Sequence, residues 1–209
     1  MPGIKLIIFD FDGTLADTMP IIFDIVTTHA KDYGIKPPTD AQKKAIRSMS
    51  PGEIIREFHI PLYKIPFLLI AGKRELEKRI SDVHTFPGIQ KMIQTLEKKG
   101  YILGVLTSNN KRSVEKFFAL HDIVGFDFIQ SEFNLFGKDK ALKGIMKKHK
   151  IDPEHVVYVG DEVRDLEASQ KAGVLSVAVT WGFSTKEILM SHKPTYIVYK
   201  ASDITQIFS

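Results

Sequence analysis

The sequence predicts an α/β fold in which a doubly wound, mainly parallel, Rossmann-like sheet carries an inserted all-helical domain after its first strand. Four short runs of apolar residues recur along the chain, and each run is nearly continuous rather than alternating. Continuous apolar strands are typical of parallel sheets that are covered by helices on both faces. The predicted strands are residues 6–9, 102–106, 156–159 and 175–179.

Helical periodicity fills the segments between these strands. The apolar side chains between residues 89 and 96 fall on one helical face, and Gly100 follows as a stop signal. The same spacing recurs at residues 142–146 and 166–170. Strands that alternate with helices in this way favour the doubly wound architecture.

The interval 18–85 interrupts that alternation, because it has no convincing strand pattern. Apolar residues from 21 to 26 form a stripe at helical spacing, and Pro51 and Pro66 suit the first turns of two further helices. We therefore expect a helical insert with a hinge at each junction. The expected division is an α/β core of residues 1–17 and 86–209 and a helical cap of residues 18–85.

The composition narrows the class of function. With 44% hydrophobic and 26% charged residues, the 209-residue chain is typical of a globular protein. It has no cysteine, which excludes disulfides, thiolate zinc sites and a cysteine nucleophile, and which fits a cytoplasmic location. The net charge of +4 is modest, and no apolar run reaches the roughly 18 residues of a membrane span. We therefore expect neither a nucleic-acid nor a membrane partner, and the sequence does not specify an oligomeric state.

An acidic cluster follows the first predicted strand, at the edge where open α/β sheets bind ligands. Asp10 and Asp12 are two positions apart, so an extended backbone would point both carboxylates to one side. Adjacent carboxylates repel each other unless a cation or a shared proton neutralises them. Because the nearby donors are oxygen atoms, we expect Mg²⁺ as that cation. Gly13 allows a tight turn out of the strand, and the Thr14 hydroxyl can hold the turn.

Two other predicted strands end in polar residues of the same kind. The third strand runs into Asp161 and Asp165, and the second runs into Thr107, Ser108 and Asn109. The carboxyl ends of parallel strands meet along one edge of a sheet. These groups should therefore converge with the first acidic cluster on one site for a metal and a phosphate.

With these motifs in order along nearly the whole chain, the protein resembles the haloacid dehalogenase superfamily, specifically its phosphoglycolate phosphatase-like branch with a small helical cap. Residues 10–14 match the motif Asp-x-Asp-Gly-Thr in full, and Thr107 and Ser108 match the hydroxyl motif. Lys138 is the best match to the lysine motif, and residues 160–165 match the acidic motif Gly-Asp-x-x-x-Asp. The resemblance implies a Mg²⁺-dependent phosphatase that hydrolyses a small phosphorylated metabolite, phosphoglycolate-like or a sugar phosphate, through an aspartyl-phosphate.

The resemblance also implies a role for each acidic residue. Asp10 would attack phosphorus and form the aspartyl-phosphate. Asp12 would protonate the leaving oxygen and then activate the hydrolytic water. A carboxylate oxygen of Asp10, the backbone carbonyl of Asp12 and the carboxylate of Asp161 would hold Mg²⁺, with Thr14 supporting them from outside the coordination shell.

Phosphate binding is implied for hydroxyl, amide and cationic groups. The Thr107 hydroxyl would donate to the phosphate, with the backbone N–H groups of Ser108 and Asn109 nearby. Lys138 would offset the charge of the phosphate oxygens, because phosphoryl transfer depends mainly on positioning and electrostatics. Asp165 would orient the lysine, a water or the metal.

Several assignments stay open at this point. Lys140 competes with Lys138 for the phosphate lysine, and Glu162 competes for a place on the metal. In the cap, Arg47 or Arg56 is hypothesised to meet an anionic part of the substrate, since a guanidinium suits a second negative charge. The sequence does not specify which phosphorylated substrate is used.

Two other functions share parts of this pattern. A phosphoglucomutase-like phosphotransferase would carry every motif and would return the phosphate to a bound sugar instead of to water. A non-catalytic phospho-acceptor or binding domain could also carry the acids, the hydroxyl and the lysine. Response-regulator receivers of that kind are shorter, however, and have no helical insert after the first strand.

Overall fold

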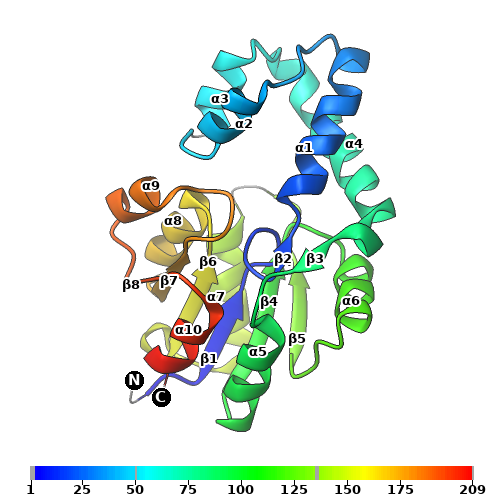
Figure 1. The fold of residues 1–209 in the computed structure, drawn as a ribbon. Coiled ribbons are helices and arrows are strands. Elements are labelled where there is room, and N and C mark those ends of the chain that lie inside the picture. The colour runs from blue at the N-terminus through cyan, green and yellow to red at the C-terminus, as the bar shows by residue number, and fades with distance from the viewer. Residues whose placement is uncertain (1–2, 50, 135–136, 209) are drawn as a thin grey trace.

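A six-stranded parallel sheet forms the core of the protein and confirms the predicted fold class (Figure 1). The computed structural model describes residues 3–49, 51–134 and 137–208. The strand order is β5-β4-β1-β6-β7-β8, and each neighbouring pair is parallel. The strands are β1 (Leu6–Phe9), β4 (Ile102–Thr107), β5 (Phe128–Ser131), β6 (Val156–Gly160), β7 (Leu175–Val179) and β8 (Tyr196–Val198).

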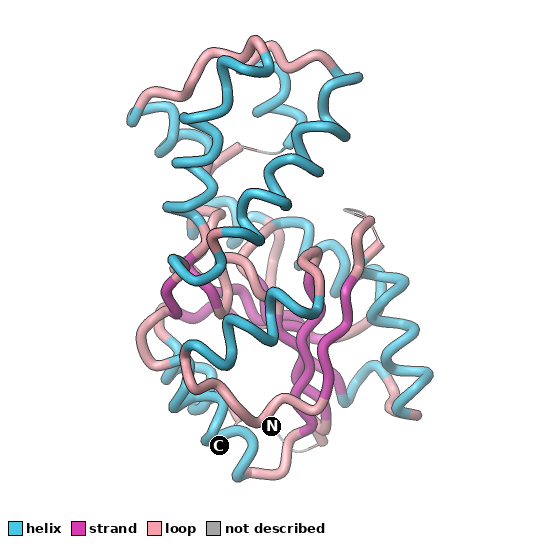
Figure 2. Tube along the Cα trace, turned by 90° about the vertical axis from the view of Figure 1, so that its right-hand side faces the viewer, coloured by secondary structure: helices cyan, strands magenta, loops and turns pink. Residues whose placement is uncertain are grey.

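Helices cover both faces of this sheet (Figure 2). Alternate residues of β1 point into two hydrophobic clusters, with Ile7 and Phe9 facing α5, α6 and α10 and with Leu6 and Ile8 facing α7 and α8. None of the helices in the described part of the chain is long and apolar enough to cross a bilayer. The core helices are α5 (Ile89–Lys98), α6 (Lys111–Leu120), α7 (Lys138–His149), η4 (Pro153–His155), α8 (Val163–Ala172), α9 (Lys186–Ser191) and α10 (Ala201–Ile207).

A group of helices, called the cap below, stands above the carboxyl ends of the strands (Figure 1). It is joined to the core by a small antiparallel ribbon, in which Ala16 pairs with Thr85 and Asp17 with His84. Pro66 occupies the first turn of its longest helix, as the sequence predicts. The elements from ribbon to ribbon are β2 (Ala16–Asp17), α1 (Met19–His29), η1 (Ala30–Tyr33), α2 (Asp40–Ile46), α3 (Pro51–Glu57), η2 (Leu62–Lys64), α4 (Ile65–Lys78), η3 (Ile80–Asp82) and β3 (His84–Thr85).

The structure adds elements that the sequence does not predict. Strands β5 and β8 lie at the two edges of the sheet, and most of their residues are only partly buried, so neither has the continuous apolar pattern of an inner strand. The interval that we expect to be wholly helical ends in β3, which is only two residues long. Such a strand leaves no periodicity to detect. The predicted division into core and cap and the cytoplasmic location stay predictions.

Candidate active site

Three adjacent strands deliver polar side chains to the edge of the sheet beneath the cap. Asp10 follows β1 directly, Thr107 ends β4, and Asp161 follows β6. Because β4 and β6 flank β1, the three side chains leave the sheet next to one another. The three residues are almost fully buried. The structure therefore brings together the ends of the strands that the sequence analysis singled out.

Lys138, the first residue of α7, forms the cationic centre of the site. Its Nζ lies 2.7 Å from Asp10 Oδ2 and 2.6 Å from Asp165 Oδ1, and its side chain is only 4% exposed. Lys140 is exposed on the same helix, so the structure places Lys138 and not Lys140 against the acids. Burial alone would lower the pKa of Lys138, but the charges of Asp10 and Asp165 outweigh it and raise that pKa.

Asp10 is held by two donors and keeps an unusual affinity for protons. Its Oδ1 accepts the backbone N–H of Phe11 at 2.8 Å, and its Oδ2 accepts Lys138 Nζ. Burial raises the pKa of Asp10 to about 7, although the Lys138 charge opposes this shift. Asp165 behaves in the opposite way, because the charges of Lys138 and Arg164 overcome burial and lower its pKa. Asp165 is therefore the carboxylate that stays ionised beside the lysine.

Asp12 has one oxygen bonded and one oxygen free. Asn109 Nδ2 donates to Asp12 Oδ2 at 2.7 Å, while the buried Asp12 Oδ1 has no partner among the described residues. Burial raises the pKa of Asp12, and the hydrogen bond from Asn109 partly offsets the shift. The backbone N–H of Asn109 donates to Thr107 Oγ1 at 3.0 Å. It is thus the side chain of Asn109 that reaches the acids, a contact that the sequence analysis missed.

Asp161 is held in place by groups from two segments that are far apart in the sequence. The Thr14 hydroxyl donates to its Oδ1 at 2.8 Å, and the backbone N–H of Phe183 donates to its Oδ2 at 2.7 Å. Gly13 and Gly182 pack so closely that a Cβ on either would fall within 3.0 Å of the Asp161 side chain. Burial raises the pKa of Asp161 well above its usual value, and nearby carboxylates raise it further.

The loop after β7 contributes to the site, although none of the predicted site residues lies in it. Besides supporting Asp161 through Phe183, it contributes Trp181, whose Nε1 donates to the backbone oxygen of Thr14 at 3.1 Å. The only available signal was a glycine, Gly182, soon after an apolar strand. Glu162, which the sequence analysis left open as a metal ligand, forms an ion pair with Arg164: Arg164 Nη2 lies 2.6 Å from Glu162 Oε1.

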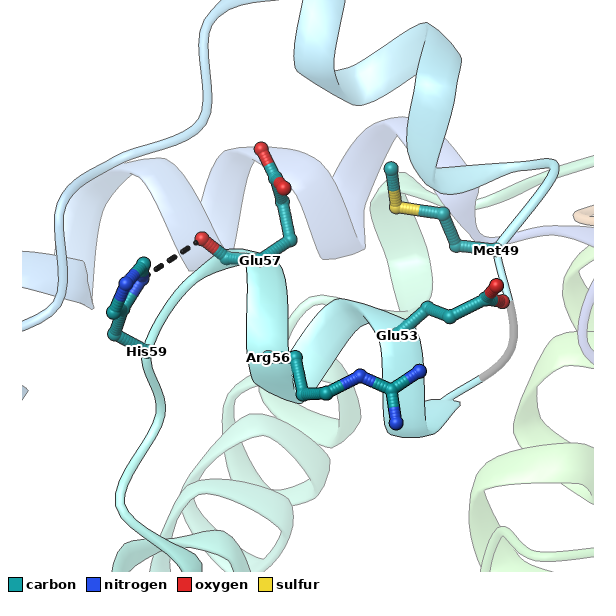
Figure 3. Close-up of a pocket in the computed structure, with 5 residues that line it drawn as sticks. All are labelled: Met49, Glu53, Arg56, Glu57 and His59. Atoms are coloured by element: carbon teal, nitrogen blue, oxygen red, sulfur yellow. Dashed lines mark hydrogen bonds between the residues drawn. The ribbon is translucent and has the colours of Figure 1, made fainter.

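The two cap arginines lie in different places. Arg47 Nη2 donates to the backbone oxygen of Gly182 at 2.9 Å, and its Nε donates to that of Phe183 at 3.3 Å. The Arg47 guanidinium thus binds the loop beside Asp161, and these two hydrogen bonds do not involve the residues that are predicted to bind phosphate. Arg56 lines a cavity of about 370 Å³ in the cap (Figure 3), together with Met49, Glu53, Glu57 and His59. A role for either arginine in contacting substrate stays a prediction.

When they are ionised, the buried acids of the site outnumber its buried cations. Among the described residues, the buried acids are Asp10, Asp12, Asp161 and Asp165, whereas Lys138 is the one buried cation and Arg164 is partly exposed. One oxygen from each of Asp10, Asp161 and Asp165 lies within 4.8 Å of the others. Hard oxygen donors in such a group suit a small divalent cation. The residues therefore fit Mg²⁺.

Comparisons with known proteins identify the family of the chain. The model of the haloacid dehalogenase-like hydrolase family matches residues 7–179. The chain belongs to this family of hydrolases. A phosphoglycolate phosphatase from Synechococcus elongatus is 32% identical to this hydrolase over 203 residues, which cover 97% of this chain and 96% of that relative. A pyrophosphatase from Oceanobacillus iheyensis is 26% identical over 216 residues, covering 98% and 97%.

A solved structure shows the same architecture. The haloacid dehalogenase-like hydrolase from Streptococcus pneumoniae superposes on this hydrolase with a TM-score of 0.83 at 24% identity, over the full length of both chains. That likeness supports the fold, while the curated relatives support the enzyme class. The predicted family and the predicted class of enzyme, a phosphatase, are confirmed.

Proposed function

We propose that this hydrolase is a Mg²⁺-dependent phosphatase that takes the phosphoryl group of a small phosphorylated metabolite onto Asp10 and releases it to water. One observation carries the proposal: the buried Asp10 is ion-paired to Lys138 at 2.7 Å, two residues from a second buried acid, Asp12, with an unpartnered oxygen. The proposed nucleophile, the proposed phosphate-binding cation and the proposed proton donor would thus lie together at one edge of the sheet.

The metal would be held by Asp10, Asp161 and the backbone carbonyl of Asp12. Asp165 would remain outside this set and would orient Lys138, which its Oδ1 binds, while its Oδ2 accepts the backbone N–H of Glu162 at 3.1 Å. When bound, Mg²⁺ would supply positive charge that offsets the charge on the phosphate oxygens and favours the ionised form of the carboxylates.

The protein's own groups account for the remaining chemistry. A carboxylate oxygen of Asp10 attacks phosphorus, and the bond from phosphorus to the leaving oxygen breaks. Lys138 and the Thr107 hydroxyl orient the phosphoryl oxygens, together with the backbone N–H of Ser108. Such positioning contributes more than covalent chemistry in phosphoryl transfer.

Asp12 supplies the proton transfers on both halves of the reaction. Its raised pKa keeps a proton available for the leaving oxygen, and its Oδ1 has no competing partner among the described residues. After the alcohol leaves, the ionised Asp12 accepts a proton from the water that attacks the aspartyl-phosphate. General acid–base help of this kind is worth about 10²–10⁴-fold in rate.

The test is release of inorganic phosphate from a panel of phosphorylated metabolites, run with Mg²⁺ or with EDTA. EDTA should abolish turnover, and Asp10→Asn should lower it by about 10³-fold or more, since it removes the nucleophile. Asp40→Asn is the matched control, because its carboxylate is 94% exposed in the cap. Turnover that survives both EDTA and Asp10→Asn would refute the mechanism. Isomerisation of a sugar phosphate in place of phosphate release would favour the phosphotransferase.

A further inference from the structure

A second cavity lies between the cap and the core. Its volume is about 180 Å³. Helix α4 of the cap supplies Lys73 and Arg74 on one side, the segment after β4 supplies Ser108 and Asn109 on the other, and Phe133 also lines it. The cavity therefore joins a cationic stretch of the cap to the loop that follows Thr107.

This cavity adjoins the proposed catalytic residues. Asn109, one of its lining residues, donates its side-chain N–H to Asp12 at 2.7 Å. A substrate whose phosphorus faces Asp10 has its leaving oxygen near Asp12, and the rest of the molecule continues from that oxygen. The loop that carries Asn109 therefore leads from the leaving oxygen to the cap cations.

The charge of Lys73 interacts with the charge of Asp12 in the acidic cluster. Its side chain is half-buried, and burial, followed by the charge of Arg164, lowers its pKa, whereas the charge of Asp12 raises it. Its Nζ lies 5.7 Å from the centroid of the Phe133 ring, within the range of a cation–π interaction. The ammonium group is thus directed to the core side of the cap.

The two cations of this cavity lack the acidic partners that other cations of the same region have. Lys78 pairs with Glu75 at 3.0 Å, and Arg79 pairs with Asp24 and Asp82. In the described ranges, no ion pair within 4.0 Å involves Lys73 or Arg74, even though Glu77 also lines the cavity. A half-buried ammonium with no carboxylate partner is suited to bind an anion.

We propose that this cavity is an anion subsite in which Lys73, with Arg74 at the rim, binds a second anionic group of the phosphorylated substrate. The proposal rests on the proposed phosphatase function and specifies its substrate class: a small phosphate compound with a carboxylate or a second phosphate a few atoms from the phosphorus. The volume equals that of roughly six liquid waters at about 30 Å³ each, which suits a small acidic group.

The test compares two esters of similar size, 2-phosphoglycolate and 2-hydroxyethyl phosphate, which differ by a carboxylate in place of a neutral hydroxymethyl group. Lys73→Met should lower kcat/KM for the carboxylated ester by roughly 10- to 100-fold, the range for a hydrogen bond to a charged group, and leave the neutral ester within about two-fold. Lys73→Arg should restore most of the loss. Lys78→Met, on the same helix with its side chain 71% exposed, is the control and should change neither.

Equal losses on both esters would overturn the subsite, because they would assign Lys73 to the transferred phosphate or to the fold. The wild-type enzyme provides a second measurement: it should prefer the carboxylated ester by at least about ten-fold, and a preference below about two-fold would also overturn the proposal.

Calorimetric binding to Asp10→Asn in the presence of Mg²⁺ separates this proposal from the phosphatase function. If wild-type enzyme hydrolyses neither ester but Asp10→Asn binds the carboxylated one better, and Lys73→Met removes that difference, the phosphatase function fails and the subsite stands. If both esters are hydrolysed and bound alike, the subsite fails and the phosphatase function stands.

Discussion

Gly182→Ala tests whether the site depends on the tight support of Asp161. A methyl group at Gly182 would fall within 3.0 Å of the Oδ2, Cβ and Cγ atoms of Asp161, whereas ordinary contacts lie at 3.4–4 Å. The carboxylate cannot retreat without losing its hydrogen bonds from Thr14 and Phe183, both shorter than 3 Å. We expect a displacement of about 1 Å, which costs about 100-fold in rate when it separates catalytic groups. Overpacking should cost about 1–3 kcal/mol of unfolding free energy.

The assay measures three quantities for Gly182→Ala: the Mg²⁺ affinity by calorimetry, kcat/KM by phosphate release, and the unfolding free energy by urea titration. Gly144→Ala is the matched control, since a Cβ there meets nothing within 4 Å and lies on α7. It should keep full activity and gain up to about 1 kcal/mol, because alanine is the better helix former. If Gly182→Ala binds Mg²⁺ and turns over substrate within about two-fold of the wild type, the reasoning is refuted.

Two further predictions concern the buried charges. Lys138→Met leaves Asp10 and Asp165 without their cation and should cost about 3–5 kcal/mol of unfolding free energy at pH 7. The control, Lys140→Met, changes an exposed side chain and should cost less than about 0.5 kcal/mol. Equal losses of the two variants in urea titration would contradict the ion pair. In EDTA, stability should fall as pH rises from about 4 to 7, because folded Asp10, with a pKa of about 7, retains a proton that the unfolded chain releases near 3.8. The lowered pKa of Asp165 makes stability rise with pH, but only below pH 3.8. Added Mg²⁺ should stabilise the protein more at pH 7 than at lower pH, since it binds ionised carboxylates. Thermal melts with an equal metal-induced shift at about pH 5 and 7.5 would argue against this linkage.

The inner part of the sheet could be predicted from sequence because burial on both faces leaves a continuous apolar run. Strands β1, β4, β6 and β7 have that pattern, and their observed bounds match the predicted ones within one residue. The edge strands β5 and β8 are held by one neighbour each and keep partly exposed side chains, so their pattern resembles that of a loop. Their existence depends on pairing with a distant strand, which local periodicity does not encode.

The site residues likewise divide into those that a strand pattern predicts and those that depend on how distant segments pack. Asp10, Asp161 and Thr107 could be placed because each follows directly from a recognisable strand, and strand order brings them together. Lys73 carries no comparable signal, since a lysine on a cap helix looks like any surface lysine until the cap is positioned over the core. The bond from the Asn109 side chain to Asp12 likewise depends on the path of the loop after β4.

The hydrogen bonds from Arg47 to the backbone oxygens of Gly182 and Phe183 have a consequence for turnover. The peptide N–H of Phe183 is also the group that anchors one oxygen of Asp161. Any movement of the cap away from the core would break the two hydrogen bonds from Arg47, and the loop that holds Asp161 would lose that support. By reciprocity, a ligand whose binding strengthens this loop would favour the closed position of the cap by the same free energy.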